Sequence, residues 1–203
     1  MSILKIIKKK WKKSQKKLGL IISISLVVGL LVYSLIQLRP NNPNSTIVNS
    51  KKDFIQQVAP KAEQLDKKYH VKASIIIAQA LLESEAGQSE LAATYHNLFG
   101  VKAGFWERKV KLPTKEYTNN QWQTVEADFK VYNSWDESLE DHTKLLVNGT
   151  SWNHNQYHKV IAAKTYAEAA QALQDAGYAT DPSYAKKIIN VIEEYQLYQY
   201  DQH

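Results

Sequence analysis

Residues 74–86 read Ser-Ile-Ile-Ile-Ala-Gln-Ala-Leu-Leu-Glu-Ser-Glu-Ala, and Gly87 follows them. Wound as an α-helix, this stretch is apolar on nearly all sides, which is the pattern of a helix buried at the centre of a domain. Gly87 is the type of residue that ends helices. It lies one turn beyond Glu83 on the same face, where its missing side chain would allow a ligand to approach.

Glu83 is the residue of this helix that could perform chemistry. It shares a helix face with Ile76, Gln79 and Ala80, so its carboxyl group is expected to be buried. Burial disfavours the ionised form, and a carboxyl that is protonated at neutral pH can serve as a general acid for a glycosidic oxygen. The alternative is that Glu83 simply caps the exposed end of the helix.

The surrounding sequence predicts a mostly helical α+β domain that begins near Lys51. A helix is expected over residues 53–69, with a kink or break at Pro60. Alternating apolar residues over 110–132 predict a β-hairpin that turns at residues 119–120.

Three further helix starts are visible after the hairpin. Ser134 and Thr165 each begin an S/T-x-x-E sequence, the form of a capping box. Asp181 and Pro182 are expected to start the last helix as N-cap and first-turn proline.

The first fifty residues predict a membrane anchor. Residues 1–17 hold eight lysines and no acid, and residues 18–38 run uncharged for long enough to span a bilayer. Because the lysines precede the span, we expect residues 1–17 to be a cytoplasmic tail, 18–38 a transmembrane helix, 39–50 a linker, and 51–203 an extracytoplasmic domain. A cleaved secretory signal is the alternative, but its apolar core is usually about 7–15 residues and ends at a small-residue cleavage site.

Charge and cysteine content exclude several classes of function. Of the 26 basic residues eight lie in residues 1–17, which leaves 18 against 20 acids. The net charge of +6 therefore comes from the tail, and we expect no nucleic-acid partner. The chain has no cysteine, so it has neither a disulfide framework nor a thiol nucleophile.

Several motifs occur in one order along residues 51–203. They are A-Q-A-L-L-E-S-E-A-G-Q-S at 78–89, N-L-F-G-V-K at 97–102, T-K-E-Y at 114–117, F-K-V-Y-N-S-W at 129–135 and Y-A-T-D-P-S-Y-A at 178–185. Together they resemble glycoside hydrolase family 73, bacterial endo-β-N-acetylglucosaminidases and flagellar peptidoglycan hydrolases. The resemblance implies a lysozyme-like domain in which a helical lobe and a small β-lobe enclose a glycan groove. Ala86 departs from the family, since many relatives carry an aromatic residue there, and this puts one groove contact in doubt.

The resemblance also implies roles for two carboxylates. Glu83 matches the family's general acid. Glu116 lies on the predicted hairpin, on the side shared by Leu112 and Thr114, and is the candidate that activates water; otherwise it is an exposed strand charge. A separation of about 5–5.5 Å suits a retaining route and about 6.5–9.5 Å an inverting one, and attack by the substrate's own acetamido group is the third possibility.

Four residues match groove positions of the family: Asn97, Phe99, Tyr178 and Tyr184. By resemblance, the amide would bind N-acetyl groups and the rings would pack on sugars. Otherwise Phe99 and Tyr184 are core aromatics and Asn97 caps a turn.

The histidines do not indicate a metal site. His154 and His158 stand four residues apart but lack the H-E-x-x-H glutamate and a third ligand. For His142, inside the helix expected after Ser134, a hydrogen-bonded structural role is favoured over catalysis.

The sequence therefore predicts an endo-β-N-acetylglucosaminidase that cuts the β-1,4 backbone of peptidoglycan without metal or cofactor. An N-acetylmuramidase and a non-catalytic wall-binding module are the alternatives. Its expected partners are glycan strands and, through residues 18–38, the membrane, and the protein is expected to be a monomer.

Overall fold

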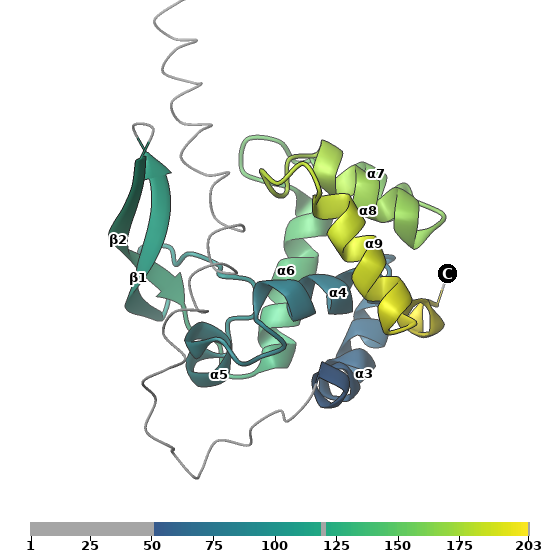
Figure 1. Ribbon diagram of the computed structural model, residues 1–203, viewed down its shortest axis with the longest axis horizontal. Helices are drawn as coiled ribbons and strands as arrows, with labels where there is room; N and C mark the ends of the chain where they lie inside the picture. The colour runs from purple at the N-terminus through teal and green to yellow at the C-terminus, as the bar shows by residue number, and fades with distance from the viewer. Residues whose placement is uncertain (1–50, 119–120, 203) are drawn as a thin grey trace, which may run out of the picture.

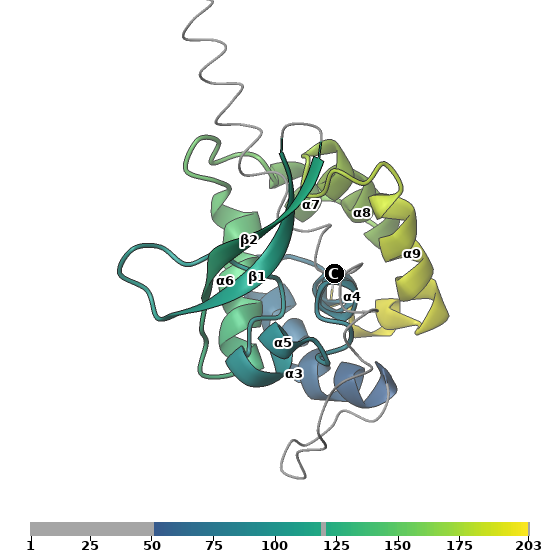
Figure 2. The ribbon, with the colours of Figure 1, turned by 60° about the vertical axis from the view of Figure 1, so that its left-hand side comes forward.

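The computed structural model describes residues 51–118 and 121–202, which form a mostly helical domain with one small antiparallel sheet. Figure 1 shows the hairpin to one side of the helices, and Figure 2, turned by 60°, shows the hairpin in front of them and α4 near their centre. The predicted mostly helical α+β class is confirmed. The elements are α3 (Lys51–Tyr69), α4 (Ala73–Glu83), α5 (Glu90–Tyr95), β1 (Lys109–Thr118), β2 (Gln121–Lys130), α6 (Trp135–Asn148), α7 (His158–Ala162), α8 (Tyr166–Asp175), α9 (Tyr184–Glu194) and the 3-10 helix η3 (Leu197–Tyr200).

The predicted tail, transmembrane helix and linker (residues 1–17, 18–38 and 39–50) lie outside the described residues. Within residues 51–118 and 121–202, no helix is long and apolar enough to cross a membrane.

Helix α4 is the centre of the core, as the sequence predicted. It packs against α3, α6, α8, α9 and η3. Ile75, Ile76 and Ile77 are each fully buried. Because burying one such side chain stabilises a fold by about 1.5–3 kcal/mol, each of these three residues contributes substantially to the stability of the core.

The expected break at Pro60 is wrong, since α3 runs without interruption from Lys51 to Tyr69. A proline inside a helix leaves the carbonyl four residues earlier without its N–H partner. Pro60 and Gln56 both lie on the exposed side of α3, where water can hydrogen-bond to that carbonyl.

Helix α4 ends at Glu83, earlier than predicted, and a tight turn follows. Glu85, Ala86 and Gly87 have positive φ angles of 54°, 55° and 79°. The Ser84 hydroxyl holds this turn, because it donates to the Ala80 carbonyl at 2.6 Å and accepts from the Gly87 N–H at 2.7 Å.

Packing explains Gly87, and the predicted opening for a ligand is wrong. A Cβ atom at this position would lie 2.7 Å from the Trp135 ring and 2.9 Å from the Phe54 ring. The residue therefore lies against the core, and its neighbour Ala86 is also buried there.

The predicted helix starts are confirmed at two positions and displaced at the third. Ser134 caps α6 by accepting from the Glu137 N–H, and Thr165 forms a complete capping box with Glu168. Helix α9 begins later than predicted, after Ser183. The Asp181 carboxylate accepts from the Ser183 N–H at 2.8 Å and hydroxyl at 2.7 Å, so Asp181 orders the turn before the helix.

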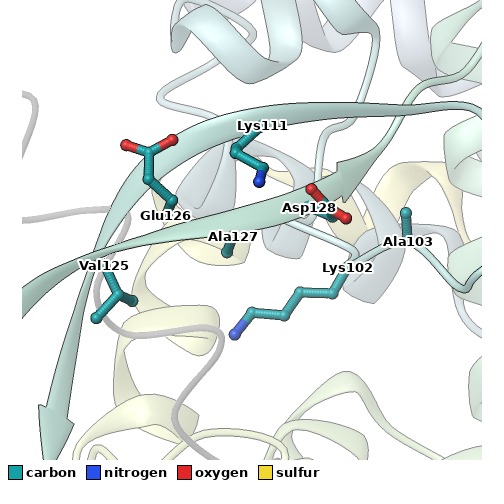
Figure 3. Close-up of a pocket in the computed structure, with 7 residues that line it drawn as sticks. All are labelled: Lys102, Ala103, Lys111, Val125, Glu126, Ala127 and Asp128. Atoms are coloured by element: carbon teal, nitrogen blue, oxygen red, sulfur yellow. The ribbon is translucent and has the colours of Figure 1, made fainter.

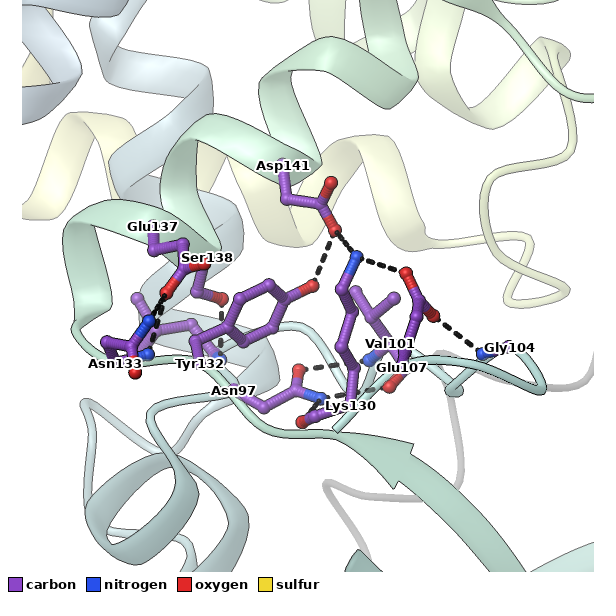
Figure 4. A network of polar contacts seen from close by, with 11 residues as sticks. Asn97, Val101, Gly104, Glu107, Lys130, Tyr132, Asn133, Glu137, Ser138 and Asp141 are labelled. Carbon is purple, nitrogen blue, oxygen red and sulfur yellow. Dashed lines mark hydrogen bonds and ion pairs between the residues drawn. The ribbon is translucent and has the colours of Figure 1, made fainter. Parts of the chain in front are cut away.

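A polar network joins the base of the hairpin to α6 (Figure 4). Lys130 at the end of β2 contacts Glu107 at 2.7 Å and Asp141 of α6 at 3.0 Å. The Tyr132 hydroxyl donates to the same Asp141 oxygen at 2.6 Å. These contacts fix the hairpin relative to the helices.

Candidate active site

Glu83 occupies the last position of α4, and its side chain reaches α9. The residue is only 7% exposed. Its Oε1 accepts a hydrogen bond from the Tyr184 hydroxyl at 2.9 Å, and that hydroxyl accepts from the Gln79 side-chain amide at 3.0 Å. The packing of α4 on α9 thus brings together residues 101 positions apart in the chain.

The surroundings of Glu83 favour its protonated form. Burial raises the pKa of this carboxyl from 4.5 to about 8, against the opposing effects of the Tyr184 hydrogen bond and the Lys187 charge. At neutral pH the group therefore carries a proton that it can donate.

A set of aromatic rings begins at Tyr184. The Tyr184 ring stacks on Tyr178 with centroids 5.5 Å apart, and the Tyr178 ring meets His142 edge-on at 5.7 Å. His142 in turn stacks on Phe99 at 3.8 Å. Tyr178 is partly exposed, whereas the other three rings are buried. The Tyr178 hydroxyl lies against the buried His142, and burial raises its pKa well above the usual value. Contact of Tyr178 with sugar stays a prediction.

Asn97 is buried and its amide is used by the protein. Its Nδ2 donates to the Val101 and Lys130 carbonyls at 2.9 and 2.8 Å, and its Oδ1 accepts from the Val101 N–H at 3.0 Å. Figure 4 shows these bonds joining the loop after α5 to the end of β2. They give Asn97 a structural role, and contact of Asn97 or the buried Phe99 with sugar stays a prediction.

Glu116 lies in β1, where its backbone pairs with Gln123. Its side chain is outside the described part of the structure. The role of Glu116, and its distance from Glu83, therefore stay predictions.

A solvent-open hollow of about 510 Å³ lies on the hairpin (Figure 3). Its Val125 and Ala127 pair with Thr114 and Leu112, the residues expected to share a face with Glu116. Ammonium and carboxylate groups line it together, as suits a polar ligand. The lining residues are Lys102, Ala103, Lys111, Val125, Glu126, Ala127 and Asp128.

Sequence reasoning did not assign site roles to three residues around Glu83 and Tyr178. Gln79 had a signal, because it precedes Glu83 by one helical turn. His142 and Lys187 gave none, since their proximity to Tyr178 and Glu83 depends on tertiary packing.

Comparison with known proteins identifies the family. The model of the glucosaminidase family, described as mannosyl-glycoprotein endo-beta-N-acetylglucosaminidase, matches residues 59–197. The chain belongs to the glucosaminidase family. This confirms the resemblance to glycoside hydrolase family 73 carried by the motifs.

Two relatives show how far the likeness extends. Exo-glucosaminidase LytG of Bacillus subtilis is 41% identical over 197 residues, which cover 96% of this chain and 70% of LytG. Peptidoglycan hydrolase FlgJ of Escherichia coli K12 is 38% identical over 161 residues, 76% of this chain and 50% of FlgJ. This chain thus spans about half of FlgJ.

A solved autolysin structure has the same fold. The catalytic domain of the autolysin Auto from Listeria monocytogenes matches with a TM-score of 0.72 at 38% identity, covering 84% of this chain and 94% of that domain. The helices and the hairpin therefore form one catalytic unit of this family.

Proposed function

We propose that this glucosaminidase-family protein hydrolyses the β-1,4 glycan backbone of peptidoglycan after N-acetylglucosamine, with Glu83 as general acid. The observation that carries the proposal is the buried Glu83 carboxyl, whose pKa is raised to about 8 and which Tyr184 holds at 2.9 Å. The name of FlgJ, a peptidoglycan hydrolase, supports peptidoglycan as the substrate, and the name of LytG, an exo-glucosaminidase, supports glycosidase activity. Family membership and the proton on Glu83 favour an enzyme over a module that only binds the wall.

The hydrogen bonds around Glu83 indicate which oxygen would deliver the proton. Tyr184 donates to Oε1, so that oxygen is already engaged. We therefore assign the acidic hydrogen to Oε2. As the bond from the anomeric carbon to the bridging oxygen breaks, Glu83 transfers this hydrogen to that oxygen, and the leaving sugar departs as an alcohol.

Glu116 is the proposed second carboxylate, which activates the attacking water. The anomeric configuration of the first product, measured by proton NMR, tests this role. Inversion is expected if a Glu116 carboxylate directs water to the far face of the sugar. Retention would instead require a covalent or acetamido-assisted intermediate, and Glu116 would not be the base of a single displacement.

The sugar at the reducing end of released fragments tests the bond that is cut. Purified peptidoglycan would be digested, reduced with borohydride and analysed by mass spectrometry. Fragments ending in reduced N-acetylglucosamine are expected. Reduced N-acetylmuramic acid there would support the second candidate, a muramidase, which the name of a probable N-acetylmuramidase of Lactococcus lactis, 37% identical over 156 residues, favours.

Fragment length tests the endo-acting mode. Internal cuts give oligosaccharides of many lengths early in the digestion. Removal of single units from strand ends, the mode in the name of LytG, would give short products from the start.

We also propose that residues 18–38 anchor the protein in the membrane, with residues 1–17 in the cytoplasm and residues 51–203 outside. The eight lysines before an uncharged stretch support this topology. Protease added to intact spheroplasts should digest the domain and spare the tail. A domain recovered from the medium without residues 1–38 would show instead that the segment is a cleaved signal.

A further inference from the structure

Three residues at intervals of three connect the start of α9 to Glu83. Asp181 lies in the turn before the helix, Tyr184 is the first residue of the helix, and Lys187 follows it. The Tyr184 hydroxyl donates to Glu83 at 2.9 Å. Because residues three apart are neighbours on a helix surface, Lys187 lies beside the residue that holds the proposed acid.

Lys187 forms an ion pair with Asp181. Its Nζ lies 2.5 Å from Asp181 Oδ2. Side chains of a helix tilt toward its N-terminus, so a lysine in the first turn of α9 reaches back to a carboxylate that precedes the helix. The Asp181 side chain is 12% exposed and the Lys187 side chain 53% exposed. The pair thus joins a largely buried carboxylate to an ammonium group that water can reach.

Both oxygens of the Asp181 carboxylate are occupied. Oδ1 accepts from the Ser183 N–H at 2.8 Å and from the Ser183 hydroxyl at 2.7 Å, while Oδ2 takes the Lys187 ammonium. The contact with Lys187 and the two bonds from Ser183 lower the pKa of Asp181 to about 2. Asp181 therefore stays ionised over the whole pH range in which Glu83 titrates.

The charge of Lys187 opposes the protonated form of Glu83. Burial raises the pKa of Glu83, whereas the Tyr184 hydrogen bond and the Lys187 charge lower it. Within residues 51–118 and 121–202, charged groups of α3, α6, α8 and η3, which also pack on α4, do not contribute to this shift. Burial and the Glu83 charge hold the pKa values of Tyr178 and Tyr184 well above the usual value, so both hydroxyls stay neutral. Lys187 is thus the described cation that acts on Glu83.

We propose that Asp181 is a positioning residue for the general acid: it holds the Lys187 ammonium in an ion pair and thereby prevents that charge from drawing the proton off Glu83. The inference rests on the proposed function for the role of Glu83, and on the contacts of Asp181 and Lys187 for its direction. An ammonium group released from Asp181 would keep its full charge beside Tyr184 and could turn toward the Glu83 carboxylate. The ion pair explains how a lysine can lie near an acid that must stay protonated.

Two substitutions should move the pKa of Glu83 in opposite directions. Lys187→Met removes the cation and should raise this pKa by about half a unit, less than the 1–3 units of a cation in direct contact. Asp181→Asn keeps an oxygen that can accept from Ser183 but releases the ammonium group, and should lower the pKa by about the same amount. Damage to the fold alone would not give shifts of opposite sign.

The pKa of Glu83 can be measured without activity. Full-length protein with ¹³C-labelled glutamate, in detergent micelles, would be titrated by carboxyl-carbon NMR, with Glu83→Gln identifying the resonance. Lys186→Met removes an exposed neighbour of the same charge on α9 and is the matched control. It should change the pKa of Glu83 by less than about 0.2 unit, since salt screens exposed charges. An unchanged pKa in Lys187→Met, or a raised pKa in Asp181→Asn, would overturn the proposal.

A double variant tests whether Asp181 acts through Lys187. The Asp181→Asn, Lys187→Met pair should show the same Glu83 pKa as Lys187→Met alone, because no ammonium group is left to release. A pKa lowered by Asp181→Asn even without Lys187 would contradict this route. If urea unfolding shows that Asp181→Asn does not fold, Lys187→Met at its exposed position still decides, since its Glu83 pKa must rise.

Kinetics on the same full-length protein test the consequence for the reaction. At about pH 9, where wild-type Glu83 is mostly ionised, a rise of half a unit should increase kcat about threefold in Lys187→Met. The opposite shift should lower kcat about threefold in Asp181→Asn. At about pH 6 both variants should stay within about twofold of wild type. Equal losses in the two variants at both pH values would show general damage and overturn the inference.

The failure of each proposal gives a different result. An inactive wild-type protein in which the two substitutions shift the Glu83 pKa as expected would reject the proposed function and keep the role of the ion pair. An active protein whose Glu83 pKa ignores both substitutions would reject the role of Asp181 alone.

Discussion

Replacing Glu83 with glutamine should change how the free energy of unfolding depends on pH. In the folded protein the pKa of Glu83 is raised from 4.5 to about 8. Between these values the folded protein keeps a proton that the unfolded chain has released. The stabilising contribution is therefore fully present below about pH 4.5 and is lost as the pH rises through about 8.

The size of this effect follows from the shift. At about 1.4 kcal/mol per pKa unit, a rise from 4.5 to about 8 corresponds to about 5 kcal/mol. A glutamine has nearly the same shape, does not titrate, and can still accept from Tyr184. The free energy of unfolding of Glu83→Gln, relative to that of wild type, should thus rise by about 5 kcal/mol as the pH increases from 4.5 to 8.

Urea unfolding followed by tryptophan fluorescence, at intervals from about pH 4 to 9, measures this difference. Residues 51–203 suffice, because the core cluster runs from Phe54 to Leu197. Glu90→Gln, at an exposed position of α5, is the control and should stay parallel to wild type. A Glu83→Gln curve that also stays parallel to wild type would refute the argument that burial keeps Glu83 protonated.

Three further substitutions test the site and its supports. Tyr184→Phe removes a hydrogen bond that lowers the pKa of Glu83, so the alkaline limb of the plot of kcat against pH should move to higher pH. The same change should lower the free energy of unfolding in urea by about 1–2 kcal/mol. Gly87→Ala should lower the free energy of unfolding by more than about 2 kcal/mol, because its Cβ would meet Trp135. The control Gly177→Ala, at a φ of 71° with open space around it, should lower it by about 1 kcal/mol. Equal losses in urea unfolding would contradict the packing account. Asn97→Ala should lower the free energy of unfolding by about 2–3 kcal/mol and speed hydrogen exchange at the Val101 amide. An unchanged exchange rate at Val101 would contradict the role of Asn97 in holding the loop.

Local chemistry in the sequence predicted most of the fold. Ser134 and Thr165 start helices because their caps depend on residues three positions away. The break predicted at Pro60 was wrong because the effect of a proline on helix continuity depends on which side of α3 faces water. The start of α9 was predicted too early because Asp181 does not cap the helix. Its carboxylate accepts from both the N–H and the hydroxyl of Ser183, and these bonds form the turn before the helix. The short helices α5 and α7 were missed, since five or six residues give too little periodicity to recognise.

The candidate site was predictable only in part. The burial of Glu83 followed from its own helix, because Gln79 and Ala80 lie on the same face. Tyr184 was predicted as a site residue only from the family resemblance. The hydrogen bonds of its hydroxyl with Glu83 and Gln79 could not be predicted from sequence periodicity. His142 was correctly given a hydrogen-bonded role, but its partner Tyr178 lies 36 residues away and could not be inferred from local pattern.

Peptidoglycan digestion by Glu83→Gln beside wild type tests the central claim most directly. Reducing ends released per minute from purified peptidoglycan would be counted at neutral pH, with Glu90→Gln as control and the unfolding midpoint showing that each variant is folded. We predict a loss of at least about 100-fold for Glu83→Gln and none for Glu90→Gln, since a positioned general acid contributes about 10²–10⁴-fold. A folded Glu83→Gln protein that releases fragments at the wild-type rate would contradict Glu83 as the catalytic acid.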